Sequence, residues 1–389
     1  MQERLAVLDG ARGVAVLGIL ILNVISFGLP QAAYLNPAFA GLPSVSDIWA
    51  WGLQNVLAEQ KFLTIFALLF GAGLQLQLRR GKGNEEMKSR LSWLLIFGAL
   101  HAIFFWDGDI LLPYGLVGLM CWRMIRDAQS PRSMLRFGLV LYCLGLLLLL
   151  ILGWLSINAA PSSFWQPDWQ TLDTEISTKL AGGVVAMKYR FHQMISMLLV
   201  VILQYGWQLA GMMVAGAGLV RSGWLQGSRL PHQYRRKALI LIPLGILIQL
   251  PGVWLNISGG WSFHWSAYFG QIPREIAAPI QAMGYLALWY AIFPSIQHTR
   301  FARAMVSVGR MALSNYILQT LLCYMIFYGF GWFNQLNRVH LLMLVPVIWL
   351  VNIAFSVLWL RHFRQGPLEW VWRKLVYWST HHHRQHESW

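Results

Sequence analysis

Ten long apolar segments limit the folds open to this chain more than any other feature of its sequence. One of them, LRFGLVLYCLGLLLLLILGWLSI at 135–157, is long enough as a helix to cross a bilayer core, which takes about 17 to 25 residues. The other nine lie at 13–30, 57–78, 91–106, 110–126, 193–220, 237–255, 277–295, 311–330 and 339–360. With 57% hydrophobic and 12% charged residues, the chain is too apolar for a soluble globular protein. The sequence predicts an all-α polytopic membrane bundle of about ten transmembrane helices.

Basic residues alternate between the loops of this predicted bundle. They precede the first segment and recur in every second loop, at 79–90, 123–136, 221–237, 300–310 and 361–384. The alternate loops carry only Lys179, Lys188, Arg190, Arg274 and Arg338. Lysine and arginine beside transmembrane ends stay in the cytoplasm, so both termini are predicted to be cytoplasmic. Anionic lipids then explain the net charge of +15, and membrane lipids, not nucleic acid, are the expected partners.

A segment at 158–190 divides the chain. It is too long for a simple connector, and its tryptophans indicate an element at the periplasmic membrane interface. It separates an N-terminal five-helix half, 1–157, from a C-terminal five-helix half with a cytoplasmic tail, 191–389. Small residues in several segments favour close helix packing, and we expect a homodimer.

The opening stretch RLAVLDGARG, residues 4–13, predicts an anion-binding site at the cytoplasmic face. Asp9 is placed to cap the helix that follows, and Arg12 stands one turn further along. Arg79 and Arg80, at the end of the second apolar segment, belong to the same basic face. A plain helix cap, with an arginine that reaches the lipid headgroups, is the alternative interpretation.

This opening resembles that of the transmembrane acyltransferases, whose first span reads roughly R-x-x-x-L-D-x-x-R-G and carries a polar residue fourteen places after the aspartate. In this chain that residue is Asn23, as in the branch of heparan alpha-glucosaminide N-acetyltransferase. The resemblance implies a catalytic role for Asn23. The histidine that follows a short way downstream in that branch is absent from VISFGLPQAAYLNPAF, residues 24–39.

Later motifs resemble the YeiB family of bacterial inner-membrane proteins, whose C-terminal half defines a domain of unknown function. These motifs are KFLTIFALLFGAG at 61–73, HAIFFWDGDILLPYGLVG at 101–118, GRMALSNYILQT at 309–320 and GPLEWVWR at 366–373. The resemblance extends over the whole chain.

His101 and Asp109 flank a predicted turn between two apolar segments. A histidine titrates near neutral pH and can take a proton from a hydroxyl or an amine. His101 is therefore the predicted base for acyl transfer, and Asp109 is its orienting partner. The alternative is structural: Asp109 shapes a turn next to Gly108, and His101 forms a hydrogen bond with a neighbouring helix.

Three further polar residues are candidates for a polar cavity. Lys61 is costly if it lies within the bilayer, where ionisable groups mark a pathway or a pair; otherwise it lies at the outer boundary. Asn315 and Gln319 stand four residues apart on one helix face. They either line a cavity or join helices through hydrogen bonds.

Three functions agree with these patterns. The first is an acyltransferase that moves an acyl group from cytoplasmic acyl-CoA, a substrate and not a resident cofactor, to a hydroxyl or amine of an envelope acceptor. The second is a transporter or channel that keeps the fold without the chemistry, and the third is a lipid-binding scaffold. Cys121, Cys143 and Cys323 show no paired spacing, so neither a disulfide nor a metal site is expected. The acyltransferase is the predicted function.

Overall fold

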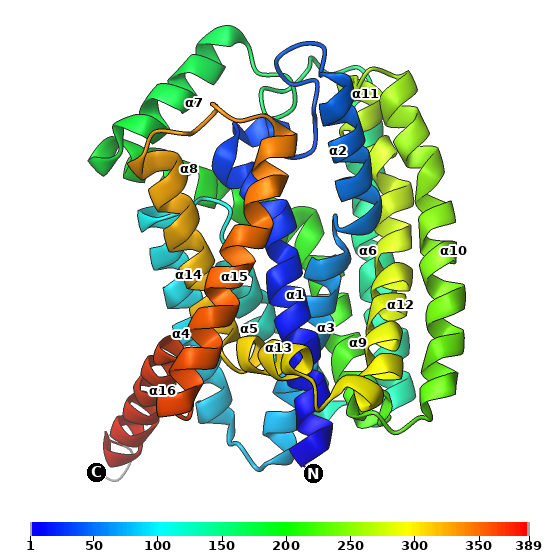
Figure 1. The fold of residues 1–389 in the computed structure, drawn as a ribbon, viewed down its shortest axis with the longest axis vertical. Helices are drawn as coiled ribbons and strands as arrows, with labels where there is room; N and C mark the ends of the chain where they lie inside the picture. Colours follow the sequence, from blue (N-terminus) through cyan, green and yellow to red (C-terminus); the bar gives the residue numbers. More distant parts are fainter. Residues whose placement is uncertain (1, 387–389) are drawn as a thin grey trace.

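A computed structural model describes residues 2–386, and this part of the chain is helical and contains no strand (Figure 1). The first half comprises α1 (Gln2–Gly28), η1 (Gln31–Tyr34), α2 (Val45–Leu57), α3 (Lys61–Arg79), α4 (Asn84–Phe104), α5 (Leu111–Asp127), α6 (Pro131–Ser156), α7 (Trp169–Ala181), α8 (Gly183–Val200), η2 (Val201–Tyr205) and α9 (Gly206–Arg221). The second half comprises η3 (Trp224–Gln226), α10 (Pro231–Ser258), α11 (Phe263–Ser266), η4 (Phe269–Gln271), α12 (Ile272–Ile296), α13 (Arg300–Arg310), α14 (Ala312–Tyr324), η5 (Met325–Gly329), α15 (Arg338–His362) and α16 (Pro367–His386). The prediction of an all-α bundle is confirmed.

The number of membrane spans is established only in part. Seven helical stretches of the described chain are long and apolar enough to cross a membrane, and an eighth is formed if α13 and α14, bent by 88° at their junction, count as one span. The remaining two predicted segments fall on α4 and α5. Helix α4 begins with the charged sequence NEEMKSR and α5 has 17 residues, so the total of ten stays a prediction.

Helix α1 runs through the centre of the bundle, and α6, α10 and α15 lie at its periphery (Figure 1). In α1, 78% of the apolar span is buried, against 22% in α10 and 28% in α6 and α15. The exposed side chains of the outer helices are large and apolar, among them Leu147, Leu239 and Leu350. Such a continuous apolar exterior suits a lipid environment.

Close contact between α3 and α9 depends on glycine. A Cβ atom at Gly71 would lie 1.8 Å from the carbonyl oxygen of Met213, and one at Gly216 would lie 1.9 Å from that of Leu68. Small residues of this kind let two membrane helices pack backbone against backbone. The two helices thereby form a tight wall beside α1 and α5.

Candidate functional site

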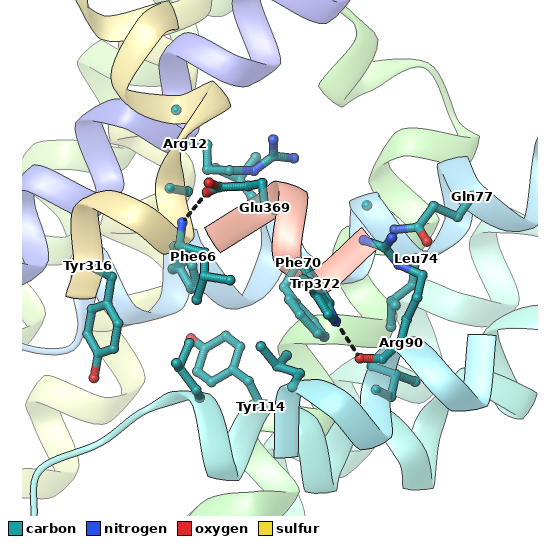
Figure 2. Close-up of a pocket in the computed structure, with 18 of the residues that line it drawn as sticks. Arg12, Phe66, Phe70, Leu74, Gln77, Arg90, Tyr114, Tyr316, Glu369 and Trp372 are labelled. Atoms are coloured by element: carbon teal, nitrogen blue, oxygen red, sulfur yellow. Dashed lines mark hydrogen bonds between the residues drawn. The ribbon is translucent and has the colours of Figure 1, made fainter. Parts of the chain in front are cut away.

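The first cavity lies at the end of the bundle that holds both chain ends (Figures 1 and 2). Its volume is about 260 Å³. Arg12 of α1, Arg90 of α4 and Arg310 of α13 line it, and we call it the arginine cavity. Much of the remaining wall is apolar, with Phe66, Leu69, Phe70, Leu94, Leu111 and Tyr114. Guanidinium groups together with an apolar wall suit a ligand that has an anionic head and an apolar arm.

One of the four predicted donor-binding residues, Arg12, lines this cavity, and Asp9 contacts Arg12 from outside the lining. Helix α1 already begins at Gln2, so Asp9 lies inside the helix, and the prediction that it caps the helix start was wrong. Its Oδ1 instead accepts a hydrogen bond from Nη1 of Arg12 at 2.8 Å. Arg79 and Arg80 are exposed and do not line the cavity.

Glu369 of α16 closes one side of the arginine cavity (Figure 2). Its carboxylate accepts hydrogen bonds from the backbone N–H groups of Leu313 and Ser314, at 2.8 and 3.1 Å, and from the Ser314 hydroxyl at 2.5 Å. These N–H groups begin α14 and have no partner within their own helix. Nearby, Nε1 of Trp372 donates to the Arg90 carbonyl at 3.0 Å. Helix α16 is thus attached to the bundle at the cavity.

The second cavity, about 440 Å³ in volume, lies toward the opposite end of the bundle. We call it the carboxamide cavity, because its polar lining includes Asn23, Gln31, Gln60, Gln193, Gln204, Gln208 and Gln271. Aromatic residues complete much of the wall, among them Tyr34, Trp106, Trp165 and Tyr205. The π-helical turn η2 between α8 and α9 contributes both Gln204 and Tyr205. Turns of this type occur frequently at functional sites.

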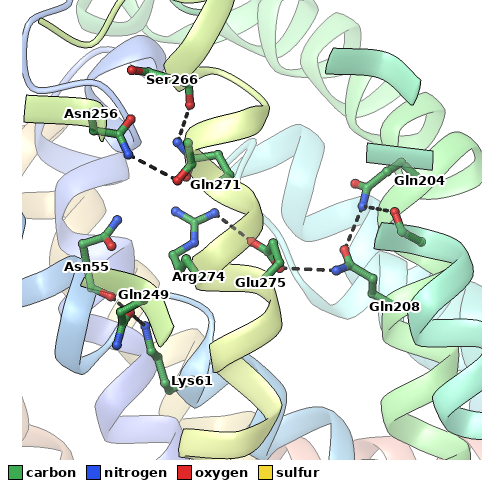
Figure 3. A network of polar contacts seen from close by, with 12 residues as sticks. Asn55, Lys61, Gln204, Gln208, Gln249, Asn256, Ser266, Gln271, Arg274 and Glu275 are labelled. Atoms are coloured by element: carbon green, nitrogen blue, oxygen red, sulfur yellow. Dashed lines mark hydrogen bonds and ion pairs between the residues drawn. The ribbon is translucent and has the colours of Figure 1, made fainter. Parts of the chain in front are cut away.

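Charged residues around the carboxamide cavity are buried and paired. Nζ of Lys179 lies 2.9 Å from Glu175 and 3.5 Å from Asp107. Burial opposes the charge on Lys179, but the two carboxylates outweigh burial and raise the pKa of this lysine well above its ordinary value. On α12, Nη2 of Arg274 donates to Glu275 at 2.8 Å (Figure 3). At this end of the bundle, these charged side chains therefore lie inside the protein.

His101 and Asp109 lie together between the two cavities, as predicted partners. Nδ1 of His101 is 2.7 Å from Oδ1 of Asp109, and Nε2 is 3.0 Å from the hydroxyl oxygen of Thr320 on α14. Asp109 Oδ2 also accepts from the backbone N–H of Leu112 at 2.7 Å, near the start of α5. The Tyr316 hydroxyl lies 3.4 Å from Asp109 Oδ1. Both of the predicted readings agree with this geometry: an oriented histidine, and a link between the α4–α5 hairpin and α14.

The walls of the two cavities meet at this cluster. Tyr114 lines both cavities, Tyr316 lines the arginine cavity and Asp109 lines the carboxamide cavity. The side chains of His101 and Asp109 are only 3% and 0% exposed. Asp109 borders the carboxamide cavity, and on the other side Tyr316, which lines the arginine cavity, lies against the pair, with its ring centroid 5.3 Å from that of His101.

Lys61 is a link between helices at the carboxamide end. It is completely buried, and its Nζ donates to the Asn55 carbonyl at 2.7 Å and to the Gln249 side chain at 2.6 Å (Figure 3). It lines neither cavity.

Asn315 and Gln319 also join helices. Nδ2 of Asn315 donates to the carbonyl of Met311 at 3.0 Å, at the break between α13 and α14, and to the Ser356 hydroxyl of α15 at 2.7 Å. Nε2 of Gln319 donates to the Val16 carbonyl of α1 at 3.2 Å. Neither residue lines either of the two cavities, so the structure favours the helix-joining interpretation for both.

Several residues of the site were not singled out by the sequence. Tyr316 and Thr320 stand four residues apart and share one helix face, which is a signal that the sequence does contain. Arg90 and Arg310 were visible only as members of basic loops, and Arg274 only as one of the few basic residues of the alternate loops. Asn23, predicted from the resemblance, lines the carboxamide cavity.

Known proteins similar to this chain share its full length. Residues 219–379 match a family described as "Protein of unknown function (DUF418)". The chain is 49% identical to "Uncharacterized protein YeiB" of Escherichia coli (strain K12) over 375 residues, and this aligned region covers 96% of this chain and 97% of that protein. It is 28% identical to "Uncharacterized protein YxaH" of Bacillus subtilis (strain 168), over 97% of this chain and 95% of that protein. No solved structure matches the chain. The near-complete match to YeiB shows that the chain belongs to the YeiB family and carries the DUF418 domain of unknown function in its C-terminal part.

Proposed function

We propose that the chain is a membrane-embedded acyltransferase that moves an acyl group from cytoplasmic acyl-CoA to a hydroxyl or amine on the outer side of the bacterial inner membrane. The observation that carries the proposal is the wall shared by two chemically different cavities, with the His101–Asp109 pair inside it. A transferase that works across a membrane needs a donor site and an acceptor site that approach each other at a base.

The arginine cavity is the proposed donor site. Arg12, Arg90 and Arg310 offer guanidinium groups for the phosphates of coenzyme A, which planar N–H donors bind well. The apolar wall that includes Phe66 and Tyr114 suits the acyl arm. The cavity lies at the end of the bundle where Arg79, Arg80 and Arg310 are exposed, and this supports our assignment of that end, with both termini, to the cytoplasmic side.

The carboxamide cavity is the proposed acceptor site. The acceptor oxygen or nitrogen attacks the thioester carbonyl carbon, and its proton passes to the His101–Asp109 pair. A C–O or C–N bond forms as the C–S bond breaks, and the thiolate of coenzyme A then takes up the proton from the pair. No electrons are exchanged with a further reactant, and no resident cofactor is required. Movement of Tyr316, whose hydroxyl contacts Asp109, opens the route from the donor side.

A transporter is the second candidate, and the same two cavities favour it. They lie toward opposite ends of the bundle and are separated by Tyr114, which lines both. A solute that passes this residue would need no acyl donor. Binding of acyl-CoA separates the two functions.

Acetyl-CoA binding to the protein purified in detergent tests the proposal, with longer acyl-CoAs and free coenzyme A measured alongside. We expect saturable binding that Arg12→Ala weakens by about tenfold or more, since a hydrogen bond to a charged group contributes about 1.5 to 3 kcal/mol. Arg80→Ala is the matched control, because Arg80 is exposed and does not line the cavity. If the wild-type protein binds none of these compounds, the acyltransferase proposal is wrong, and solute uptake into proteoliposomes becomes the next measurement.

A further inference from the structure

Arg274 of α12 is a buried arginine with most of its donors unused. It lines the carboxamide cavity and is 4% exposed. Its Nη2 donates to Glu275, whereas Nε and Nη1 have no hydrogen-bond partner (Figure 3). These two nitrogen atoms together carry one N–H and one NH₂ group that can donate. The side chain is therefore arranged to meet a partner that the protein itself does not supply.

The other buried basic residues at this end of the bundle do have hydrogen-bond or ion-pair partners. Lys61 and Arg338 donate to carbonyl and carboxamide oxygens, and Lys179 pairs with two carboxylates. Arg190 donates to the carbonyls of Ile103 and Phe104, at 2.8 and 3.2 Å. Within the described residues, Arg274 alone among the buried lysines and arginines has buried nitrogen atoms that lack a partner. Buried donors without a partner are destabilising, which sets Arg274 apart.

Nearby protein groups do not supply acceptors for the free N–H groups of Arg274. Glu275 already accepts from Arg274 and, at 3.4 Å, from Gln208. Glu59 is buried, interacts electrostatically with Arg274 and has an Oε1 atom without a partner, so no hydrogen bond joins Oε1 to the guanidinium. A second unpartnered donor, Nε1 of Trp106, belongs to the same cavity lining. The buried, unpartnered side-chain atoms of the residues that line this cavity are thus all donors, and they call for a ligand rich in acceptor oxygens.

We infer that the carboxamide cavity binds an oxyanion, a carboxylate or a phosphate, through Arg274. A guanidinium fits these groups because its planar N–H donors match two of their oxygens. The inference rests on the proposed function in one respect, since it makes the acyl acceptor an anionic molecule. Either a free metabolite or a lipid headgroup supplies this chemistry.

The unfolding temperature of the protein in phosphatidylcholine nanodiscs, measured with increasing inorganic phosphate, tests this site. A ligand that binds the folded state raises the unfolding temperature. The test variant combines Arg274→Gln with Glu275→Gln, so that no lone charge stays buried. We expect phosphate to stabilise the wild-type protein, with an apparent Kd that rises at least about tenfold in the double variant. Arg80→Gln is the matched control, because Arg80 is exposed, lines neither cavity and should leave this stabilisation in place.

The outcomes separate the alternatives. Stabilisation that is equal in the wild-type protein and the double variant, or that Arg80→Gln abolishes, overturns the inference. If the double variant does not fold, Arg274→Lys keeps the charge without the planar fork, and unchanged phosphate affinity in that variant also overturns it. Replacing phosphatidylcholine with phosphatidylglycerol, without phosphate, identifies a lipid headgroup if it produces the same Arg274-dependent stabilisation. Phosphate binding at Arg274 without acetyl-CoA binding would retain the anion site and contradict the acyltransferase alone.

Discussion

The two ends of the bundle hold their basic residues in opposite ways. At the end with the chain termini, Arg79, Arg80 and Arg310 are exposed. At the other end, Arg190 and Arg338 are buried and donate to oxygen atoms of other segments, whereas the buried Arg274 meets only its neighbour Glu275. The comparison teaches that basic residues at the first end are open to solvation, whereas those at the second end are buried beside specific partners.

This difference also divides the expected effects of mutations. A charge that water or lipid headgroups solvate contributes little when it is removed alone. A buried charge with fixed partners leaves unpaired groups behind when it is removed. Single substitutions of buried charged residues at the carboxamide end should therefore lower stability strongly. Single substitutions of exposed charged residues at the arginine end should each have a small effect.

The mutation with the largest expected effect lies in the wall between the two cavities. We expect His101→Gln to lower the rate of acyl transfer by about 10² to 10⁴, the usual contribution of a positioned base. Acetyl-CoA binding should stay within about twofold of the wild-type value, because His101 lines neither cavity. Turnover and equilibrium binding measured on the same preparation check this. If His101→Gln kept the full rate of turnover, His101 would have only a structural role.

The second effect compares one lysine from each end. Lys61→Met removes both hydrogen bonds to Asn55 and Gln249, and we expect it to destabilise the protein by about 1 to 3 kcal/mol, because buried oxygen acceptors lose their donor. Lys82→Met, at an exposed ion pair with Glu86, should change stability by less than about 0.5 kcal/mol. Unfolding curves in detergent measure both. Equal losses in the two variants would contradict the division between the ends.

The third effect sharpens the role of the arginine end. Arg310→Gln should weaken acetyl-CoA binding by about tenfold, and raising the salt concentration should reduce the difference between this variant and the wild-type protein, because salt screens exposed charges. Arg80→Gln is the comparison, since Arg80 is exposed outside the cavity. Titrations at two salt concentrations decide whether the position of the arginine matters beyond its charge.

The smallest effect concerns Glu369, which brings a negative charge to the arginine end. Glu369→Gln weakens the contact with Leu313 and Ser314 and should cost about 1 kcal/mol, as losing a helix cap does. The same change removes a like charge from the proposed site of the phosphates, so donor binding should tighten severalfold. Unchanged or weaker binding would show that Glu369 does not face the bound donor.

Hydropathy predicted the helices well, because every apolar segment that a helix can place in lipid has a simple signal in the sequence. The partners of the buried charged residues had no such signal in the sequence. Lys61 meets Gln249 across 188 residues of sequence, and Arg338 meets Gln54 across 284, so no local spacing reveals either pair. The pair of His101 and Asp109 was predictable because its members lie only 8 residues apart.

Other differences have local causes. Asp9 matched the pattern of a helix cap, but the helix extends back to Gln2, and the carboxylate pairs with Arg12 instead. The charges at the start of α4 and the length of α5, 17 residues, set these two helices apart from the seven long apolar ones. Thr320 shares a helix face with Tyr316, but a threonine in an apolar helix is common, so this spacing alone did not single it out.

The sharp break between α13 and α14 also gives the arginine cavity a source of positive potential that no side chain supplies. The break exposes the amino-terminal end of α14 to the cavity, where Leu313 and Ser314 present their N–H groups to Glu369. The aligned peptide dipoles of a helix place roughly half a positive charge at such an end. This charge belongs to the backbone and stabilises the Glu369 carboxylate, so replacing Arg12, Arg90 and Arg310 together leaves it in place, and only removal of the Glu369 charge makes it available to a bound anion.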